Sequence, residues 1–179
     1  NIMTVCILGN SLTALTLAKA LVNYEIDVEL ISSKKNYKII DSRTIGISKY
    51  NVDFFNSNII NIKKLIWNIK KIEIFSENLK REKLINFKAD KKQLFSIIEN
   101  NKLHQLLNKD LLKNKFFRSK FSMGKNLSFL NKYELVINCD PFNFITKRYF
   151  SKKISKEYNS TAYTTIISHD KIINDVAVQ

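Results

Sequence analysis

The sequence of 179 residues has few of the residues that mark several classes of protein. Its two cysteines, Cys6 and Cys139, lie in apolar runs and form no Cys-x-x-Cys pair, which excludes a disulfide framework. Its two histidines form no cluster that would suggest a metal site. No apolar run approaches the ~20 residues of a membrane-spanning helix, and no secretory signal precedes the first apolar run. We therefore expect a protein of a reducing cytoplasm.

Acidic residues are also scarce, with 16 against 30 lysines and arginines, and the formal net charge is +14. A protein that reads nucleic acid clusters its positive charge on one face and uses arginine for bidentate contacts with bases. Here the only arginines are Arg43, Arg81, Arg118 and Arg148, and lysines are scattered through nearly every segment. This pattern favours solvated lysine surfaces, and it leaves open an attraction to an anionic membrane surface.

Residues 4–31 carry the clearest pattern in the chain. The apolar run Thr4-Val5-Cys6-Ile7-Leu8 meets Gly9, and an apolar helix-forming run then continues to about Tyr24. Residues 27–31 predict the next strand. Strand, tight turn, helix and strand form the opening unit of a nucleotide-binding sheet, in which the N-terminus of the helix suits a pyrophosphate.

The glycine motif of this unit departs from the dinucleotide-binding pattern. That pattern is G-x-G-x-x-G, and the chain has G-N-S-L-T-A from Gly9 to Ala14. Gly9 can make the tight turn, and Ala14 is small enough for close packing of helix on strand. Ser11, however, places a Cβ where the backbone should approach phosphate. Ser32 stands where an acidic residue is usual, and Glu29 lies inside the strand, so a similar unit without a dinucleotide stays open.

Alternating apolar and polar residues in the middle of the chain predict a second sheet inserted in the first. Residues 69–75 and 84–87 predict an antiparallel pair of strands, and residues 50–66 predict one or two helices. Leucines spaced at i, i+3, i+4 and i+8 predict an amphipathic helix after residue 99, with Asn100 as its N-cap. The remaining strands are predicted at 94–98, 116–121, 126–130, 135–139, 160–168 and 175–178.

Three polar residues have both a structural and a functional interpretation. Arg43, near Gly46 in a short apolar stretch, either pairs with Asp41 or contacts an anion near the glycine turn. Asp140 either initiates an Asp-Pro turn or presents a carboxylate at the carboxyl end of a strand, where open α/β sheets bind ligands. His104 lies beside the leucine stripe, and for a lone histidine there a structural role is favoured.

The order of these segments resembles the flavoprotein aromatic hydroxylases, and within them the ubiquinone-biosynthesis hydroxylases. The opening V-C-I-L-G-N-S-L-T-A-L looks like their FAD-binding unit, and D-S-R-T-I-G-I-S is similar to their D-x-R-x-x-A-L-S segment. I-I-E-N-N-K-L-H-Q-L-L looks like V-E-N-x-x-L-x-x-x-L, and E-L-V-I-N-C-D-P takes the place of D-L-V-I-G-A-D-G. The resemblance covers the whole chain but stops before the family's later G-D motif, so we expect a chain truncated at its C-terminus.

The resemblance implies an α/β fold, with a Rossmann-like FAD-binding parallel sheet and an inserted antiparallel β-sheet substrate subdomain. The FAD-binding domain would comprise residues 1–66 and 91–152, and residues 67–90 and 153–179 would begin the substrate domain. We expect strands 4–8, 27–31 and 135–139 to share one sheet, and strand 160–168 to pair with the inserted one. By position in the family, the residues that bind the cofactor would be Gly9, Ser11, Leu12, Ala14, Arg43, Asn100 and Asp140. Arg43 and Asp140 are expected to approach the same cleft as the glycine turn.

The activity implied is that of an FAD-dependent monooxygenase that hydroxylates an aromatic prenylated precursor of ubiquinone, with NAD(P)H as reductant. The resemblance names no catalytic side chain and no metal ligand, and the piece alone is expected to be inactive. The location implied is the cytoplasm, with room for peripheral contact with the inner face of the membrane or a quinone-synthesising complex. Two other readings are a non-catalytic family member that acts in assembly and, less favoured, a basic nucleic-acid-binding protein.

Overall fold

The computed structural model describes residues 3–32, 43–76, 82–88, 93–121, 128–150, 152, 154–163, 165–168, 170 and 175–178. The chain divides into two compact units. The first comprises residues 1–39 and 104–163, and the second comprises residues 40–103 and 164–179. The domain limits expected from the family resemblance stay a prediction.

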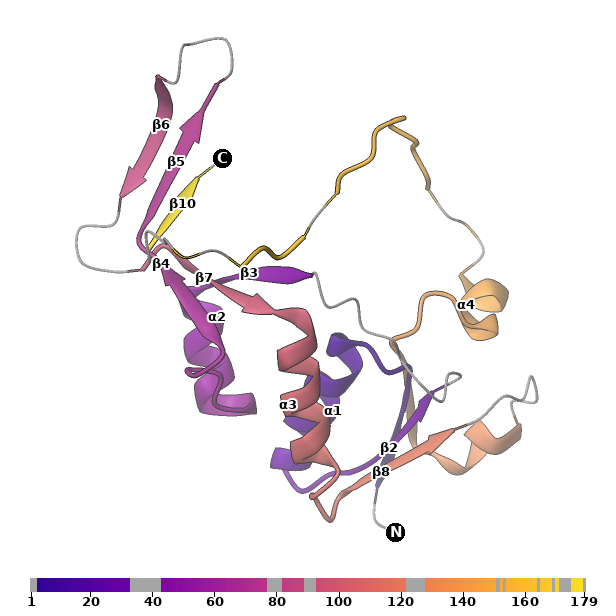
Figure 1. The fold of residues 1–179 in the computed structure, drawn as a ribbon. Coiled ribbons are helices and arrows are strands. Elements are labelled where there is room, and N and C mark those ends of the chain that lie inside the picture. Colours follow the sequence, from indigo (N-terminus) through magenta and orange to yellow (C-terminus); the bar gives the residue numbers. More distant parts are fainter. Residues whose placement is uncertain are drawn as a thin grey trace. The chain divides into compact units, whose positions relative to one another are not determined.

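The first unit is built on a four-stranded parallel sheet (Figure 1). Every neighbouring pair is parallel, and the strands lie in the order β8 (Phe117–Phe121), β2 (Asp27–Ser32), β1 (Thr4–Leu8) and β9 (Leu135–Asn138). The prediction that 4–8, 27–31 and 135–139 share one sheet is confirmed. Helix α1 (Leu12–Asn23) connects β1 to β2 and buries Ala14, Leu15, Ala18 and Val22. Strand β1 reads as a continuous apolar run because strands of a parallel sheet are covered on both faces.

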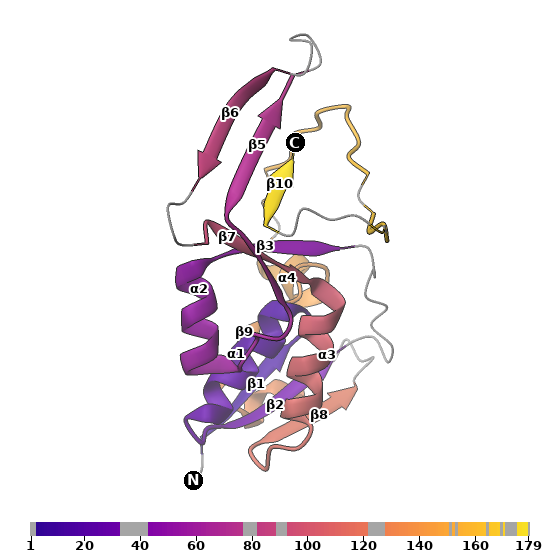
Figure 2. The same ribbon diagram turned by 60° about the vertical axis from the view of Figure 1, so that its left-hand side comes forward.

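Three further helices among the described residues belong wholly or partly to the first unit. They are α3 (Asn100–Leu111), which enters this unit at His104, the 3₁₀-helix η3 (Ser128–Lys132) and α4 (Phe144–Tyr149). Helices α1 and α3 lie side by side (Figures 1 and 2), and Lys19 of α1 pairs with Asp110 of α3 at 2.6 Å.

The predicted strand at 126–130 is wrong over residues 128–130, which belong to η3; residues 126 and 127 lie outside the described part of the chain. Phe129 and Leu130 both pack against the core formed by Cys6, Leu8 and Ile31. Consecutive residues of a strand point to opposite faces, so a strand would turn one of the two away from this core. A helical turn lets both side chains reach it.

The second unit contains two three-stranded sheets (Figure 2). In one sheet β7 (Phe95–Glu99) lies between β3 (Thr44–Ser48) and β4 (Ile66–Ile69) and is antiparallel to both. In the other, β5 (Lys71–Phe75) lies between β6 (Lys83–Lys88), which is antiparallel to it, and β10 (Val176–Val178), which is parallel. The pairing of β5 with β6 confirms the predicted antiparallel pair. Between β3 and β4 come α2 (Lys49–Phe54) and the π-helix η1 (Phe55–Ile59).

Two strand predictions need correction in the second half of the chain. The single strand expected at 69–75 is broken, because the N–H groups of Lys70 and Lys71 both donate to the carbonyl of Asp175, at 2.8 and 3.0 Å. The strand expected at 160–168 is wrong for its described residues, which are irregular. Tyr163 and Ile167 are 92% and 73% exposed. Strand propensity reflects the fit of a side chain to a half-buried surface, and these side chains have little such surface.

Candidate cofactor-binding site

Gly9 forms a tight turn at the carboxyl end of β1. Its φ is +114°, a value that side chains rarely allow, and its N–H donates to the carbonyl of Ile31 at 2.8 Å. A Cβ built on Gly9 would lie 3.2 Å from Cβ of Asp140 and 3.3 Å from its backbone nitrogen. Glycine is therefore required here for its conformation and for the close approach of the chain after β9.

Ser11 is the N-cap of helix α1. Its hydroxyl accepts the N–H of Ala14 at 3.3 Å, and its carbonyl accepts the N–H of Leu15 at 3.0 Å. The first N–H groups of a helix lack partners within the helix and carry partial positive charge. The serine hydroxyl already binds the N–H group of Ala14. An anion at this end of the helix therefore has the N–H groups of Leu12 and Thr13 for its contacts.

Asp140 takes the turn-initiating role that was one of its two interpretations. Its Oδ1 accepts the N–H of Phe142 at 2.9 Å. Its own N–H donates to Oδ1 of Asn138 at 3.2 Å, and its carbonyl accepts the hydroxyl of Thr146 at 2.8 Å. The turn brings Asp140 against Gly9, so two predicted site residues that lie far apart in sequence meet at one edge of the sheet.

A network of amide side chains holds this turn, and the sequence analysis did not identify it. Asn143 is the N-cap of α4 and accepts the N–H of Thr146 at 2.9 Å. The Nδ2 group of Asn143 donates to Oδ1 of Asn138 at 2.7 Å, and Nδ2 of Asn138 donates to the hydroxyl of Thr146 at 2.7 Å. The usable signal was the asparagine directly before the first helical residue, because asparagine is a favoured N-cap.

Arg43 and Asn100 are brought together in the second unit. The N–H of Asn100 donates to the carbonyl of Arg43 at 2.9 Å, next to the β3–β7 pair of Thr44 and Glu99. Asn100 is the first residue of α3 rather than the residue before it, and its Oδ1 is buried with no hydrogen-bond partner among the described residues. Asp41, the alternative partner of Arg43, lies outside the described residues. The expected approach of Arg43 to the glycine turn stays a prediction.

His104 reaches the glycine turn from helix α3. Its Nε2 lies 3.0 Å from the carbonyl oxygen of Asn10, and the residue is only 8% exposed. Burial lowers the pKa of His104, and the bond to Asn10 opposes that shift. The imidazole is therefore neutral at pH 7, with the proton on Nε2, because a carbonyl can only accept.

A cavity of about 310 Å³ opens beside the turn at the carboxyl ends of β2 and β8. It is lined by Asn10, Ser32, Asn108, Leu112, Ser119, Lys120 and Phe121. The lining includes a lysine and no carboxylate. Ligands of open parallel sheets bind at this edge, which makes the cavity part of the candidate site.

Glu29 is buried within strand β2, so its carboxylate does not replace the acidic residue that is missing at position 32. It is 4% exposed, and its Oε1 lies 2.8 Å from Nζ of Lys120 and 3.7 Å from Nζ of Lys132. Burial alone would raise the pKa of Glu29, but Lys120, Tyr133 and Lys132 outweigh it and hold the pKa below its ordinary value. The same burial raises the pKa of the Cys6 thiol to about 11, with Glu29 adding to the rise, so Cys6 is a structural thiol.

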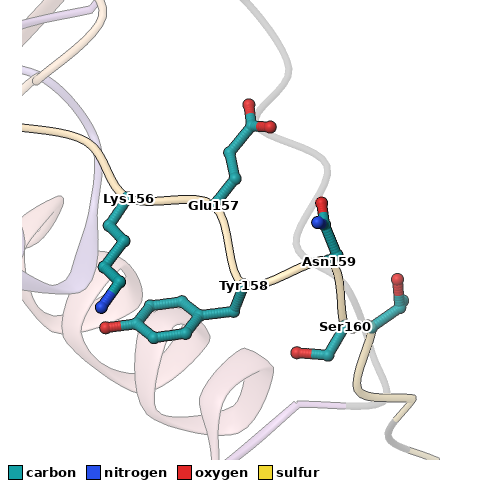
Figure 3. Close-up of a pocket in the computed structure, with 6 residues that line it drawn as sticks. Lys156, Glu157, Tyr158, Asn159 and Ser160 are labelled. Atoms are coloured by element: carbon teal, nitrogen blue, oxygen red, sulfur yellow. The ribbon is translucent and has the colours of Figure 1, made fainter.

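A second cavity, of about 510 Å³, is lined only by Lys156 to Thr161 (Figure 3). Nζ of Lys156 lies 5.1 Å from the ring centre of Tyr158, and Figure 3 shows Glu157 pointing away from both. One stretch of six residues supplies every wall, and we assign no site to it.

The described part of the chain contains no group of three histidine, cysteine, aspartate or glutamate side chains that could hold a metal ion. Within the same residues, none of the helices combines the length and the apolar character needed to cross a bilayer.

Neither a protein-family model nor a curated protein matches the sequence, whereas many solved structures share its fold. PqsL from Pseudomonas aeruginosa, solved with 2-aminobenzoylacetate, is 10% identical with a TM-score of 0.64, and the match covers 88% of this chain. The p-nitrophenol 4-monooxygenase PnpA from Pseudomonas putida DLL-E4 is 12% identical, with a TM-score of 0.55 over 66% of this chain. HpxO from Klebsiella pneumoniae, solved with FAD and uric acid, is 14% identical, with a TM-score of 0.53 over 65%.

The chain has the fold of the FAD-dependent monooxygenases. It spans 48% of PqsL, 32% of PnpA and 30% of HpxO. The unit β1–α1–β2 has the strand–turn–helix–strand arrangement of dinucleotide-binding units, and Gly9 stands at the turn between β1 and α1. The expected fold class, a parallel sheet combined with separate antiparallel sheets, is confirmed.

Proposed function

We propose that the chain is the FAD-binding part of a flavin-dependent aromatic monooxygenase. The observation that carries the proposal is the turn at Gly9. It has a positive φ, packs against Asp140 and precedes the N-terminus of α1 at the carboxyl edge of a parallel sheet. Pyrophosphate groups of dinucleotides bind at such turns. The shared fold of the monooxygenases supports the same cofactor.

The residues of the turn fit a dinucleotide with one weak point. Gly9, Ser11, Leu12 and Ala14 would bind the pyrophosphate, and the cavity of about 310 Å³ has room for the adenosine half. Because Ser32 stands where an acidic residue is usual, no carboxylate is present there to bind the ribose of the adenosine half. A hydrogen bond to a charged group contributes about 1.5–3 kcal/mol, so its loss weakens binding by roughly ten- to a hundredfold.

By their positions in the family resemblance, Asn100 and Arg43 would also contact the cofactor. The buried Oδ1 of Asn100 is an acceptor without a protein partner and suits a cofactor hydroxyl or ring N–H. The side chain of Arg43 would reach the cofactor as an anion contact, and Asp140 would lie at the same edge of the sheet as the glycine turn. The first domain would comprise residues 1–66 and 91–152, and the substrate domain would begin with 67–90 and 153–179.

When bound, FAD supplies the redox and oxygen chemistry, and the protein supplies binding, orientation and exclusion of water. The substrate we propose is an aromatic prenylated precursor of ubiquinone, with NAD(P)H as reductant. The basis is the family resemblance together with relatives of the same fold whose substrates are aromatic, such as 2,6-dihydroxypyridine-3-hydroxylase from Arthrobacter nicotinovorans. A prenylated substrate resides in the membrane, and a net charge of +14 favours peripheral contact with anionic lipid.

The test is FAD binding by the full-length protein. We expect flavin absorbance in the purified protein and saturable quenching of flavin fluorescence on titration of the FAD-free form. Gly9→Val should abolish this binding, with circular dichroism to verify that the variant is folded. Equal binding by Gly9→Val and the wild type would refute the proposed site. A wild type that takes up no FAD would favour a non-catalytic role in assembly.

A further inference from the structure

His104 is a buried side chain that contacts the candidate phosphate-binding turn without belonging to it. It lies 94 residues from Asn10 in sequence, and its Nε2 group donates to the carbonyl of Asn10 at 3.0 Å. The residue is 8% exposed. A buried donor of this kind, aimed at a single main-chain carbonyl, fixes the orientation of the peptide group to which that carbonyl belongs.

The peptide group held by His104 joins Asn10 to Ser11. It contains the C=O of Asn10 and the N–H of Ser11, so fixing one fixes the direction of the other. A trans peptide is planar, and its C=O and N–H bonds point in opposite directions. While the carbonyl of Asn10 points to His104, the N–H of Ser11 points away from it. If this peptide flipped, a carbonyl would replace that N–H and repel a phosphate.

Two nearby peptides, the one that precedes Gly9 and the one that follows Ser11, are already fixed by other bonds. The N–H of Gly9 donates to Ile31 at 2.8 Å, and the carbonyl of Ser11 accepts from Leu15 at 3.0 Å. The peptide between Asn10 and Ser11 takes its bond from outside the turn, from the side chain of His104.

We propose that His104 is a positioning residue for the cofactor, which holds the N–H of Ser11 toward the pyrophosphate by binding the carbonyl of Asn10. This inference rests on the proposed function, because it names the ligand that the oriented N–H binds. It gives a histidine outside the glycine motif a role in orienting the backbone at the third position of that motif, where the usual pattern has its second glycine.

The experiment compares three variants of the full-length protein. His104→Leu keeps an apolar side chain of similar reach and removes the donor. His104→Gln restores an N–H donor near the position of Nε2. Asp110→Asn is the matched control, because it removes the charge from a different polar contact of α3, the 2.6 Å ion pair with Lys19 of α1, without touching the turn.

Three quantities are measured for each variant: the dissociation constant for FAD from flavin fluorescence, the urea midpoint, and the amide hydrogen exchange of residues 4–15 without FAD. His104→Leu is expected to weaken FAD binding by about three- to tenfold, as for the loss of one hydrogen bond, and to speed exchange in the turn. His104→Gln should bind within about twofold of the wild type. Asp110→Asn should lower the urea midpoint and leave FAD binding within about twofold.

Equal FAD affinities for His104→Leu and Asp110→Asn, or a failure of His104→Gln to restore affinity, would overturn the proposal. If His104→Leu does not fold, His104→Asn takes its place, since its shorter amide does not reach Asn10. If the wild type itself binds no FAD, the proposed function fails. Unchanged exchange in His104→Leu would then show separately that His104 does not hold the turn.

Discussion

The substitution Gly9→Ala adds one methyl group where the chain leaves β1. This point lies next to Ile31 of β2 and to the residues that follow β9. At a φ of +114° a residue with a side chain is strained, at a cost of about 1–3 kcal/mol. The new Cβ would lie 3.2 Å from Cβ of Asp140 and 3.3 Å from the carbonyl carbon of Cys139, so backbone must shift by a few tenths of an ångström. Such overpacking costs about 1–3 kcal/mol. The sum, about 2–6 kcal/mol, is a large part of the ~5–15 kcal/mol that keeps a domain folded.

Urea unfolding measures this loss directly. With a slope of about 2 kcal/mol per molar urea, a loss of about 4 kcal/mol lowers the midpoint by roughly 2 M. Gly46→Ala is the matched control, because Gly46 has ordinary strand geometry and its added Cβ would lie 3.7 Å from the ring of Phe95, an ordinary contact. The control should be neutral or stabilising by up to about 1 kcal/mol. Equal midpoints for Gly9→Ala and Gly46→Ala would refute the argument from strain and close packing.

Three further predictions follow from the contacts around the turn. Ser11→Gly should tighten FAD binding severalfold, because it frees the N–H of Ala14 for phosphate at a cost of a few tenths of a kcal/mol in capping; weaker binding on titration would contradict this. Because the pKa of Glu29 is lowered in the folded state, its contribution to stability is present above the unfolded pKa of about 4.3 and is lost as the pH falls through the folded value. The stability gap between the wild type and Glu29→Gln should therefore shrink between pH 7 and pH 3, and a constant gap in urea midpoints would count against it. Thr146→Val should cost about 1–3 kcal/mol by calorimetry, since the carbonyl of Asp140 loses its donor, and an unchanged melting temperature would show that solvent replaces the hydroxyl.

The parallel sheet could be predicted from the sequence because its strands carry their own signal. Strand β1 is an apolar run that ends at Gly9, and Ser11 marks the start of α1 by its capping hydroxyl. Burial on both faces forces such strands to be apolar throughout, so local composition and tertiary position agree. Strand β9 was predictable from its apolar run, although it lies at the edge of the sheet. The meeting of Asp140 with Gly9 follows from the rule that parallel strands end at a common edge.

Other elements depend on packing that the local sequence does not contain. Phe129 and Leu130 form a 3₁₀ turn because both are needed on one core, and Ile167 finds no sheet although it lies in a strand-like run. The break at Lys70 depends on Asp175, more than a hundred residues later. In each case the presence or absence of a distant packing partner decides the conformation.

The residues of the candidate site also divide into those that the local sequence predicts and those that depend on packing. Gly9 and Ser11 could be found from the motif, since their roles are those of backbone and helix end. His104 and the network of Asn138 with Asn143 could not, because their partners depend on how α3 and α4 pack. The roles of Arg43 and the other residues taken from the family resemblance stay predictions that FAD titration can test.

Because β1 lies between β2 and β9, one of its edges stays without a partner strand until the ribosome has made β9. Strand β2 follows β1 after a single helix, whereas the chain around β9 comes much later; Thr4 and Glu134, joined by a 2.8 Å bond, are 130 residues apart. At about 5–20 residues per second, translation takes roughly 6–26 seconds to cover that distance. Throughout this interval β1 has an unpaired edge along an apolar strand, which is open to pairing with other nascent chains. The hazard of misassembly during synthesis is therefore set by the length of the chain between β1 and β9, and it grows with every residue inserted there.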